Sequence, residues 1–218
     1  VGLFTYAADV RDYLEARGRV PIPSYIRGGE ADERDKEDYQ TVFAKDTGSV
    51  AAPTAGLHFT PELLSKLQDE GHSLAKVTLH VGMGTFAPVK TEDIRSHRMH
   101  TENFFIPSKE WETIQSSSSR IAVGTTSLRV LESSVNDNGE LVAPADEGLS
   151  TDIFLYPGKR VRSIQGLITN FHLPKSTLLM LVSSLIGREK TLELYAEAIE
   201  RQYRFYSYGD ALCILLEE

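Results

Sequence analysis

The sequence predicts an α/β fold, a three-layer α/β/α sandwich in which helices cover both faces of a mostly parallel or mixed sheet. Short apolar segments rich in β-branched residues alternate with segments of helical periodicity, which favours parallel strands joined by helices. An apolar content of 41% and a charged content of 25% are ordinary for a globular protein. The 218 residues can bury a large core, and we expect a single domain over residues 1–218.

Helices are expected where apolar residues recur three or four positions apart between start and stop signals. Thr60 is a good N-cap, and Pro61 suits the first helical position. Leu64 and Leu67 then supply a buried face before Gly71 ends the helix. The expected helices are 9–17, 61–70, 107–116, one that carries Leu128 to Leu131, 175–187 and 190–203.

Strands are expected where β-branched and aromatic residues form short apolar runs. Val77, Leu79 and Val81 alternate with polar residues and are predicted to form one such strand. The expected strands are 77–81, 121–123, 151–156, 167–173 and a last one after residues 208–210. Because ligands bind at the carboxyl ends of strands in open α/β sheets, we expect the functional site there.

Two glycine-containing turns follow the predicted strands. Gly82 and Gly84 allow a turn that other residues cannot make, or bring backbone N–H groups close to a ligand. Residues 124–127, which read GTTS, form a tight turn from strand to helix. This geometry suits a small anionic or hydroxyl-rich ligand, although no Walker motif is present.

The run AAPTAGLHFT, residues 51–60, is a further candidate for ligand binding. Small residues such as Thr54 and Gly56 leave room for a helix, a strand or a ligand to approach. His58 lies just before the predicted helix start at Thr60, where backbone donors and the helix dipole favour an anion. This loop is therefore expected to bind a carboxylate or a phosphate.

The histidines cluster at the predicted strand ends and helix starts. Of the six, His72 lies in an ordinary polar helix end. Any one of the other five is more often structural than catalytic, but together they favour one cleft in which imidazoles remove or donate protons. These five are His58, His80, His97, His100 and His172.

A metal site is the alternative use of these histidines. His97, His100 and Glu102 form an H-x-x-H pair with a nearby carboxylate, and His80 or His172 could add a ligand. The spacing is a poor match, because helical metal motifs place two histidines four residues apart and no HExxH occurs. A metal-dependent hydrolase is therefore the third choice, and no metal is expected.

Hydroxyl and amide side chains accompany the histidines. Each is more often a cap or a turn residue, but together they predict a pocket for a sugar or a nucleoside. They are Thr85, Thr125, Thr126, Thr169 and Asn170.

The charge pattern limits the partners. A net charge of −8 argues against a protein that coats nucleic acid, because counterion release needs clustered Lys and Arg. Lys159, Arg160 and Arg162 could form a local patch for one folded RNA, although a solvated surface is favoured. No apolar run reaches 18 residues and no signal peptide is evident, so we expect a cytoplasmic protein without membrane contact.

Long sequence blocks carry a family resemblance. The blocks are PIPSYI, YQTVFA, AAPTAGLHFT, VTLHVGMGTFAPV, HRMHTE, AVGTTSLRVLES, TDIFLYPG, LITNFHLPKSTLLMLVSSLIG and YRFYSYGDA. From about Pro21 to the end, and in the same order, they resemble the S-adenosylmethionine:tRNA ribosyltransferase-isomerases of queuosine biosynthesis. Several blocks exceed eight residues, so a chance match is not credible.

The resemblance implies an enzyme that uses S-adenosylmethionine as a ribosyl donor rather than a methyl donor. The ribosyl group is transferred to the aminomethyl-deazaguanine at the wobble position of tRNA and isomerised. The products are epoxyqueuosine in tRNA, adenine and methionine. We expect a monomer whose residues 1–218 correspond to the larger α/β catalytic domain of the family, without the further N-terminal elements and the inserted β-barrel domain. The alternative is a non-catalytic RNA- or nucleotide-binding fragment.

The resemblance also suggests roles for the candidate residues. One or two of the five histidines would supply the base and the acid, and Glu102 or Asp152 would orient an imidazole. Arg129, or the helix start after His58, would bind the methionine carboxylate. The residues expected to contact substrate are Thr54, Gly56, Gly82, Gly84, Thr85, Thr125, Thr126, Ser127, Arg129, Asp152, Thr169 and Asn170.

Overall fold

The computed structural model of the chain describes residues 10–45, 49, 51–82, 93–142 and 149–216. The chain divides into two compact units between residues 40 and 41. The first unit contains α1 (Val10–Arg17), the short 3-10 helix η1 (Arg27–Gly29) and α2 (Asp35–Asp38). The buried carboxylate of Asp35 pairs with Arg27 and accepts the backbone N–H of Asp32, which gives this polar segment an ordered structure.

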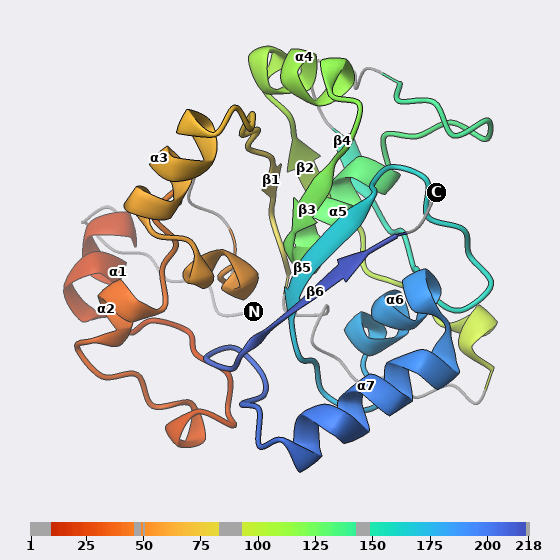
Figure 1. Cartoon of the computed structure of the whole chain (residues 1–218). Helices are drawn as coiled ribbons and strands as arrows, with labels where there is room; N and C mark the ends of the chain where they lie inside the picture. The colour runs from red at the N-terminus through yellow and green to blue at the C-terminus, as the bar shows by residue number, and fades with distance from the viewer. Residues whose placement is uncertain (1–9, 46–48, 50, 83–92, 143–148, 217–218) are drawn as a thin grey trace. The chain divides into compact units, whose positions relative to one another are not determined.

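The second unit holds two three-stranded sheets and the helices around them (Figure 1). The first sheet, in the order β1-β2-β4, is antiparallel and consists of β1 (Thr78–Leu79), β2 (Glu102–Phe105) and β4 (Leu149–Thr151). The second sheet has the order β3-β5-β6 and consists of β3 (Ile121–Val123), β5 (Gly166–Asn170) and β6 (Ala211–Leu215). Strand β5 pairs in parallel with β3 and antiparallel with β6.

The helices of this unit lie close to their predicted positions. They are α3 (Pro61–Asp69), α4 (Ser108–Ser116), α5 (Gly124–Glu132), α6 (Thr177–Ile186) and α7 (Arg188–Glu200), with the 3-10 helices η2 (Thr54–His58) and η4 (Ile94–Ser96). The predicted cap of α3 is confirmed, because the Thr60 side chain accepts the N–H of Leu63 at 3.2 Å. In the part of the chain that the structure describes, no helix has the length and apolar character needed to span a bilayer.

The α/β class is confirmed, but the prediction of one sheet is wrong for the described strands. They form two sheets, and β3 with β5 is the parallel pair among them. Strand β2 lies where no strand was predicted, and the predicted strand 151–156 is replaced by β4, which ends at Thr151. The strand expected at 167–173 ends at Asn170. That residues 1–218 form one catalytic domain stays a prediction.

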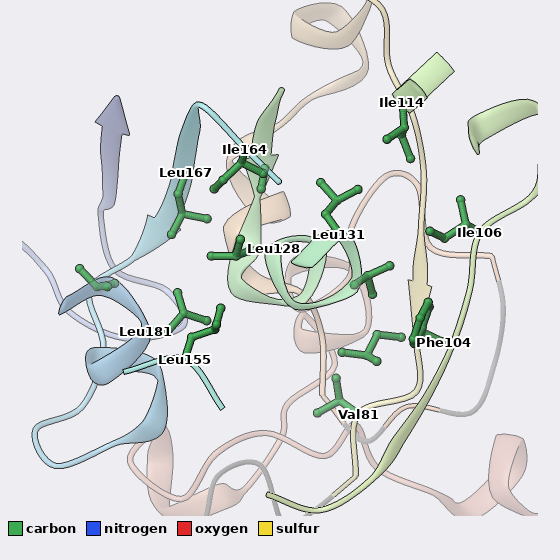
Figure 2. Packing of buried hydrophobic residues seen from close by; sticks show 14 of the residues in the cluster. Val81, Phe104, Ile106, Ile114, Leu128, Leu131, Leu155, Ile164, Leu167 and Leu181 are labelled. Carbon is green, nitrogen blue, oxygen red and sulfur yellow. The ribbon is translucent and has the colours of Figure 1, made fainter. Parts of the chain in front are cut away.

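Helix α5 packs against strands of both sheets. It contacts β1 of the first sheet and both β3 and β5 of the second. Leu128 and Val130 are fully buried, and a single apolar core includes residues from both sheets. Figure 2 shows Leu128 of α5 on the side of Leu167, and Leu131 on the side of Ile106 and Ile114. The helix therefore has an apolar surface toward each sheet.

Helix α5 begins immediately after strand β3, without a connecting loop. Gly124 follows Val123 directly and has a φ of 87°. Residues with a side chain rarely adopt this left-handed conformation, so glycine permits the abrupt change of direction. A Cβ atom at Gly124 would lie 3.7 Å from the Cβ atom of Ala55 in η2, so this turn also brings η2 close to the helix start.

Replacing Leu128 by Ala is expected to lower the free energy of unfolding by about 2 to 5 kcal/mol, because it leaves a cavity between the two sheets. Leu192→Ala is the matched control, since Leu192 in α7 is 46% exposed, and it should cost less than about 1 kcal/mol. Urea denaturation of both variants tests this. Equal losses would contradict the central position of α5.

Candidate active site

The strongest candidate site lies where strands β3 and β5 end and helix α5 begins. The 3-10 helix η2 contacts both β5 and α5 at this point. Because β3 and β5 are parallel, their carboxyl ends lie together, as expected for a ligand site in an α/β protein. We call the group formed by Thr54, His58, Asn170 and Gly209 the β5-end cluster.

Hydrogen bonds of Asn170 hold the β5-end cluster together. Asn170 is the last residue of β5 and is 2% exposed. The Thr54 hydroxyl donates to its Oδ1 at 3.2 Å. Its Nδ2 lies 3.2 Å from Nε2 of His58 and donates to the carbonyl oxygen of Gly209 at 3.3 Å. Three segments that are distant in the sequence therefore meet at one buried amide.

An exposed ion pair borders the β5-end cluster. Arg204 Nη2 lies 2.7 Å from Asp210 Oδ1, and the Arg204 backbone N–H donates to Oδ2 at 2.8 Å. Hydrogen bonding to the Arg204 side chain lowers the pKa of Asp210. The carboxylate beside the cluster therefore stays charged at neutral pH.

A second group includes Thr169 and His172. The Thr169 hydroxyl lies 2.9 Å from His172 Nε2, and the His172 backbone N–H donates to the Tyr195 hydroxyl at 2.9 Å. Burial lowers the pKa of His172 from an ordinary 6.5 to about 4 and raises the pKa of Tyr195 to about 12. His172 is therefore neutral at physiological pH. Because successive strand residues point to opposite faces, Thr169 and Asn170 hold their histidines from opposite sides of β5.

A third group is a buried ion pair between β2 and α5. Arg129 Nη1 lies 2.5 Å from Glu102 Oε2, and the backbone N–H of Gly82 donates to Glu102 Oε1 at 3.0 Å. Both charged residues are 3% exposed. Nε and Nη2 of Arg129 have no hydrogen-bond partner within the described ranges. Arg129 was expected to bind the methionine carboxylate, and in this structure its Nη1 binds the carboxylate of Glu102.

The other predicted histidines and acids lie on the first sheet and its neighbouring segments. The backbone N–H of His80 donates to Asn103 at 2.8 Å, which continues the pairing of β1 with β2. The ring of His97 meets Phe154 edge to face, with centroids 5.2 Å apart. His100 and Asp152 are exposed.

The remaining predicted contacts lie on η2 and at the start of α5. Thr125 and Thr126 are half-buried, and the Ser127 hydroxyl donates to the Val123 carbonyl at 2.9 Å. A Cβ atom at Gly56 would lie 2.6 Å from a ring atom of Phe43, so close packing is one reason for glycine there. Gly84 and Thr85 lie outside the described residues.

The structure brings the predicted residues together in three hydrogen-bonded groups. These groups are Thr54, His58 and Asn170; Gly82, Glu102 and Arg129; and Thr169 and His172. The convergence of all five histidines on one cleft stays a prediction. Among the described residues, no group of three or more His, Cys, Asp or Glu side chains has the arrangement of a metal site.

Sequence reasoning missed the Gly209 carbonyl, which accepts from Asn170, and the pair of Asp210 with Arg204 beside it. The block YRFYSYGDA carried a usable signal, because a charged pair flanks a glycine turn. A Cβ atom at Gly209 would lie 2.5 Å from the Arg204 carbonyl oxygen, so this tight turn requires glycine. The turn places the Gly209 carbonyl next to Asn170.

Comparison with known proteins gives one consistent result. A family profile described as "Queuosine biosynthesis protein" matches residues 2–214. A relative from Erythrobacter litoralis, named S-adenosylmethionine:tRNA ribosyltransferase-isomerase, is 50% identical over 99% of this chain and 64% of its own length. A relative of the same name from Acaryochloris marina is 53% identical over 94% of this chain and 55% of its own length. The chain thus spans less than two thirds of these relatives.

A solved structure supports the fold. The crystal structure of an S-adenosylmethionine tRNA ribosyltransferase from Thermotoga maritima aligns with a TM-score of 0.57 and 38% sequence identity. The alignment covers 74% of this chain and 51% of that one.

Replacing Arg129 by Met is expected to lower the free energy of unfolding by about 3 to 5 kcal/mol, because it removes the guanidinium that pairs with the buried Glu102 carboxylate. Arg201→Met is the control, since Arg201 and Glu197 form an exposed pair at 2.7 Å whose loss should cost less than about 1 kcal/mol. Urea unfolding measures both. Similar values for the two variants would refute a structural role of the buried pair.

His172 is expected to make stability depend on pH. Between pH 6.5 and about 4 the unfolded chain binds a proton at this position that the folded protein does not accept. The free energy of unfolding should therefore fall as the pH drops through this window, by on the order of 3 kcal/mol. His172→Gln should remove this part of the loss in urea titrations, whereas His72→Gln, at an exposed position, should retain it. Identical pH profiles for wild type and His172→Gln would rule this out.

Proposed function

The chain belongs to the queuosine biosynthesis protein family, and we propose that it performs the ribosyl transfer for which its relatives are named. In the proposed reaction the ribosyl group of S-adenosylmethionine moves to the aminomethyl-deazaguanine at the wobble position of tRNA and is isomerised. Epoxyqueuosine forms in the tRNA, and adenine and methionine are released. The enzyme is proposed to act as a cytoplasmic monomer.

The observation that carries this proposal is the β5-end cluster in a chain that matches the family profile from residue 2 to 214. Its polar side chains are a buried amide, a threonine hydroxyl and an exposed imidazole, placed where Thr125 and Thr126 begin α5. Neutral groups of this kind suit the hydroxyl groups and ring nitrogens of a nucleoside. This set supports S-adenosylmethionine as the ligand.

The chemistry of S-adenosylmethionine gives the predicted histidines their roles. The sulfonium acidifies neighbouring C–H bonds, so a base can begin the reaction, and the departing adenine needs a hydrogen-bond donor or an acid. We propose that His58, in the β5-end cluster, serves as the hydrogen-bond donor or acid. The base then belongs to the set His80, His97, His100 and His172. A neutral His172 with a pKa of about 4 is a weak base, which favours the other three.

The second candidate function is a non-catalytic RNA- or nucleotide-binding fragment. The observation in its favour is that Lys159, Arg160 and Arg162 are exposed, which leaves a local basic patch to contact RNA phosphates. Binding of precursor-bearing tRNA without turnover would support this function. The third candidate function is a metal-dependent hydrolase. Turnover that is lost when a metal chelator is added would indicate it.

The test is release of free adenine from S-adenosylmethionine mixed with precursor-bearing tRNA and the 218-residue chain. Wild type should release adenine, and His58→Ala should reduce the rate about 100-fold or more. His72→Ala is the control, because His72 is exposed beyond the end of α3 and should leave the rate near wild type. Tight tRNA binding without adenine release would overturn the proposal in favour of the binding fragment.

A further inference from the structure

The contacts of Asn170 determine which nitrogen of His58 carries a proton. An asparagine amide has a carbonyl oxygen that accepts and an NH₂ group that donates two hydrogen bonds. Asn170 is 2% exposed, and its amide faces the Thr54 hydroxyl, the Gly209 carbonyl and the His58 ring. The amide orientation therefore follows from what each of these neighbours is able to do.

The Gly209 carbonyl fixes the orientation of the amide. A backbone carbonyl oxygen only accepts hydrogen bonds, so the Asn170 atom 3.3 Å from it is the NH₂ nitrogen. The Thr54 hydroxyl is free to donate and completes the arrangement at Oδ1. A reversed amide would place two oxygens against each other at a buried position, which is strongly unfavourable.

The same NH₂ nitrogen lies 3.2 Å from His58 Nε2. One of its protons is directed to Gly209, so the other is directed to the imidazole. A nitrogen that accepts a hydrogen bond carries a lone pair and no proton, and in a neutral imidazole the other ring nitrogen then carries the proton. His58 is therefore protonated on Nδ1.

We propose that Asn170 is a positioning residue that holds His58 as the neutral Nδ1–H tautomer, so that His58 offers a hydrogen-bond donor, and not a base, to a bound nucleoside. This inference rests on the proposed function for its ligand. The acceptor is a ring nitrogen or an oxygen of the sulfonium nucleoside. A neutral imidazole can polarise such an atom without giving up its proton, so no proton transfer is required of His58.

Among the described residues, none accepts a hydrogen bond from Nδ1 of His58, because the contact of the ring is the one between Nε2 and Asn170. The nearby carboxylate of Asp210 is held by Arg204, with Oδ1 and Oδ2 accepting at 2.7 and 2.8 Å. His58 itself is an exposed residue at the end of η2. The donor that Asn170 creates is therefore available at the surface of the β5-end cluster.

The direct test is the nitrogen NMR spectrum of the 218-residue chain with isotopically labelled histidine, assigned with a His58→Gln variant. At about pH 9, where histidine side chains in general are neutral, His58 should show a protonated Nδ1 and an unprotonated Nε2. A protonated Nε2 in wild type would overturn the inference. The wild-type spectrum decides this without any variant of Asn170.

Two substitutions separate positioning from simple packing. In Asn170→Asp the carboxylate accepts from Nε2–H, so the His58 signals should change to the other tautomer. Thr54→Val removes the hydrogen bond to Oδ1 but leaves both N–H contacts, so the Nδ1–H tautomer should persist. Loss of the Nδ1–H tautomer in Thr54→Val, or its retention in a folded Asn170→Asp protein, would contradict the role of Asn170.

Adenine release connects the tautomer to the reaction. Asn170→Asp should lower kcat about 100-fold, the loss typical of one removed donor, with a smaller change in KM. If wild type shows the Nδ1–H tautomer but releases no adenine, the proposed function fails and the tautomer assignment stands. If wild type releases adenine with His58 protonated on Nε2, the proposed function stands and this inference fails.

Discussion

The packing of α5 between two sheets is the constraint on which the second unit depends. A helix buried on two sides must present apolar residues in both directions, and α5 does so with Leu128 toward Leu167 of β5 and Leu131 toward Ile106, which follows β2. Arg129 lies between these two leucines in the sequence and is buried by the same packing. Its charge is tolerable because Glu102 of β2 supplies a carboxylate.

Two groups of polar residues have different roles in this arrangement: the buried ion pair is structural, and the β5-end cluster is the candidate for chemistry. The buried pair ties β2 and the N–H of Gly82 to α5, and removing one partner of such a pair costs more than the intact pair contributes to net stability. The β5-end cluster is different, because a buried amide there holds an exposed imidazole. Strand β5 positions Thr169 and Asn170 on opposite faces, so one short strand holds two histidines in unlike environments.

The sequence predicted the helices better than the sheets, for physical reasons. The start of α3 is specified by Thr60 and Pro61 within a few residues, and the local signal sufficed. Strand β2 begins with a charged residue, Glu102, and exists because it pairs with β1 and β4, which no local pattern reveals.

The candidate site was predicted in part. Thr54, His58 and Asn170 were all identified from residue type and position, but their association depends on contacts across 112 and 116 residues of sequence. Gly209 contributes a backbone carbonyl, so the block YRFYSYGDA indicated a turn there but not the contact of that carbonyl with Asn170. Arg129 was identified for its charge, and its partner followed only from the packing of α5 on β2.

The order of the strands has a consequence for synthesis of the chain. The first sheet takes its strands from positions one, two and four along the sequence, and the second from positions three, five and six. A growing polypeptide thus leaves the ribosome with the first sheet incomplete until β4 (Leu149–Thr151) has appeared and the second until β6 (Ala211–Leu215) has appeared. Long-range pairing of this kind slows folding, and it delays complete burial of α5 until the strands that follow it in the sequence have been made.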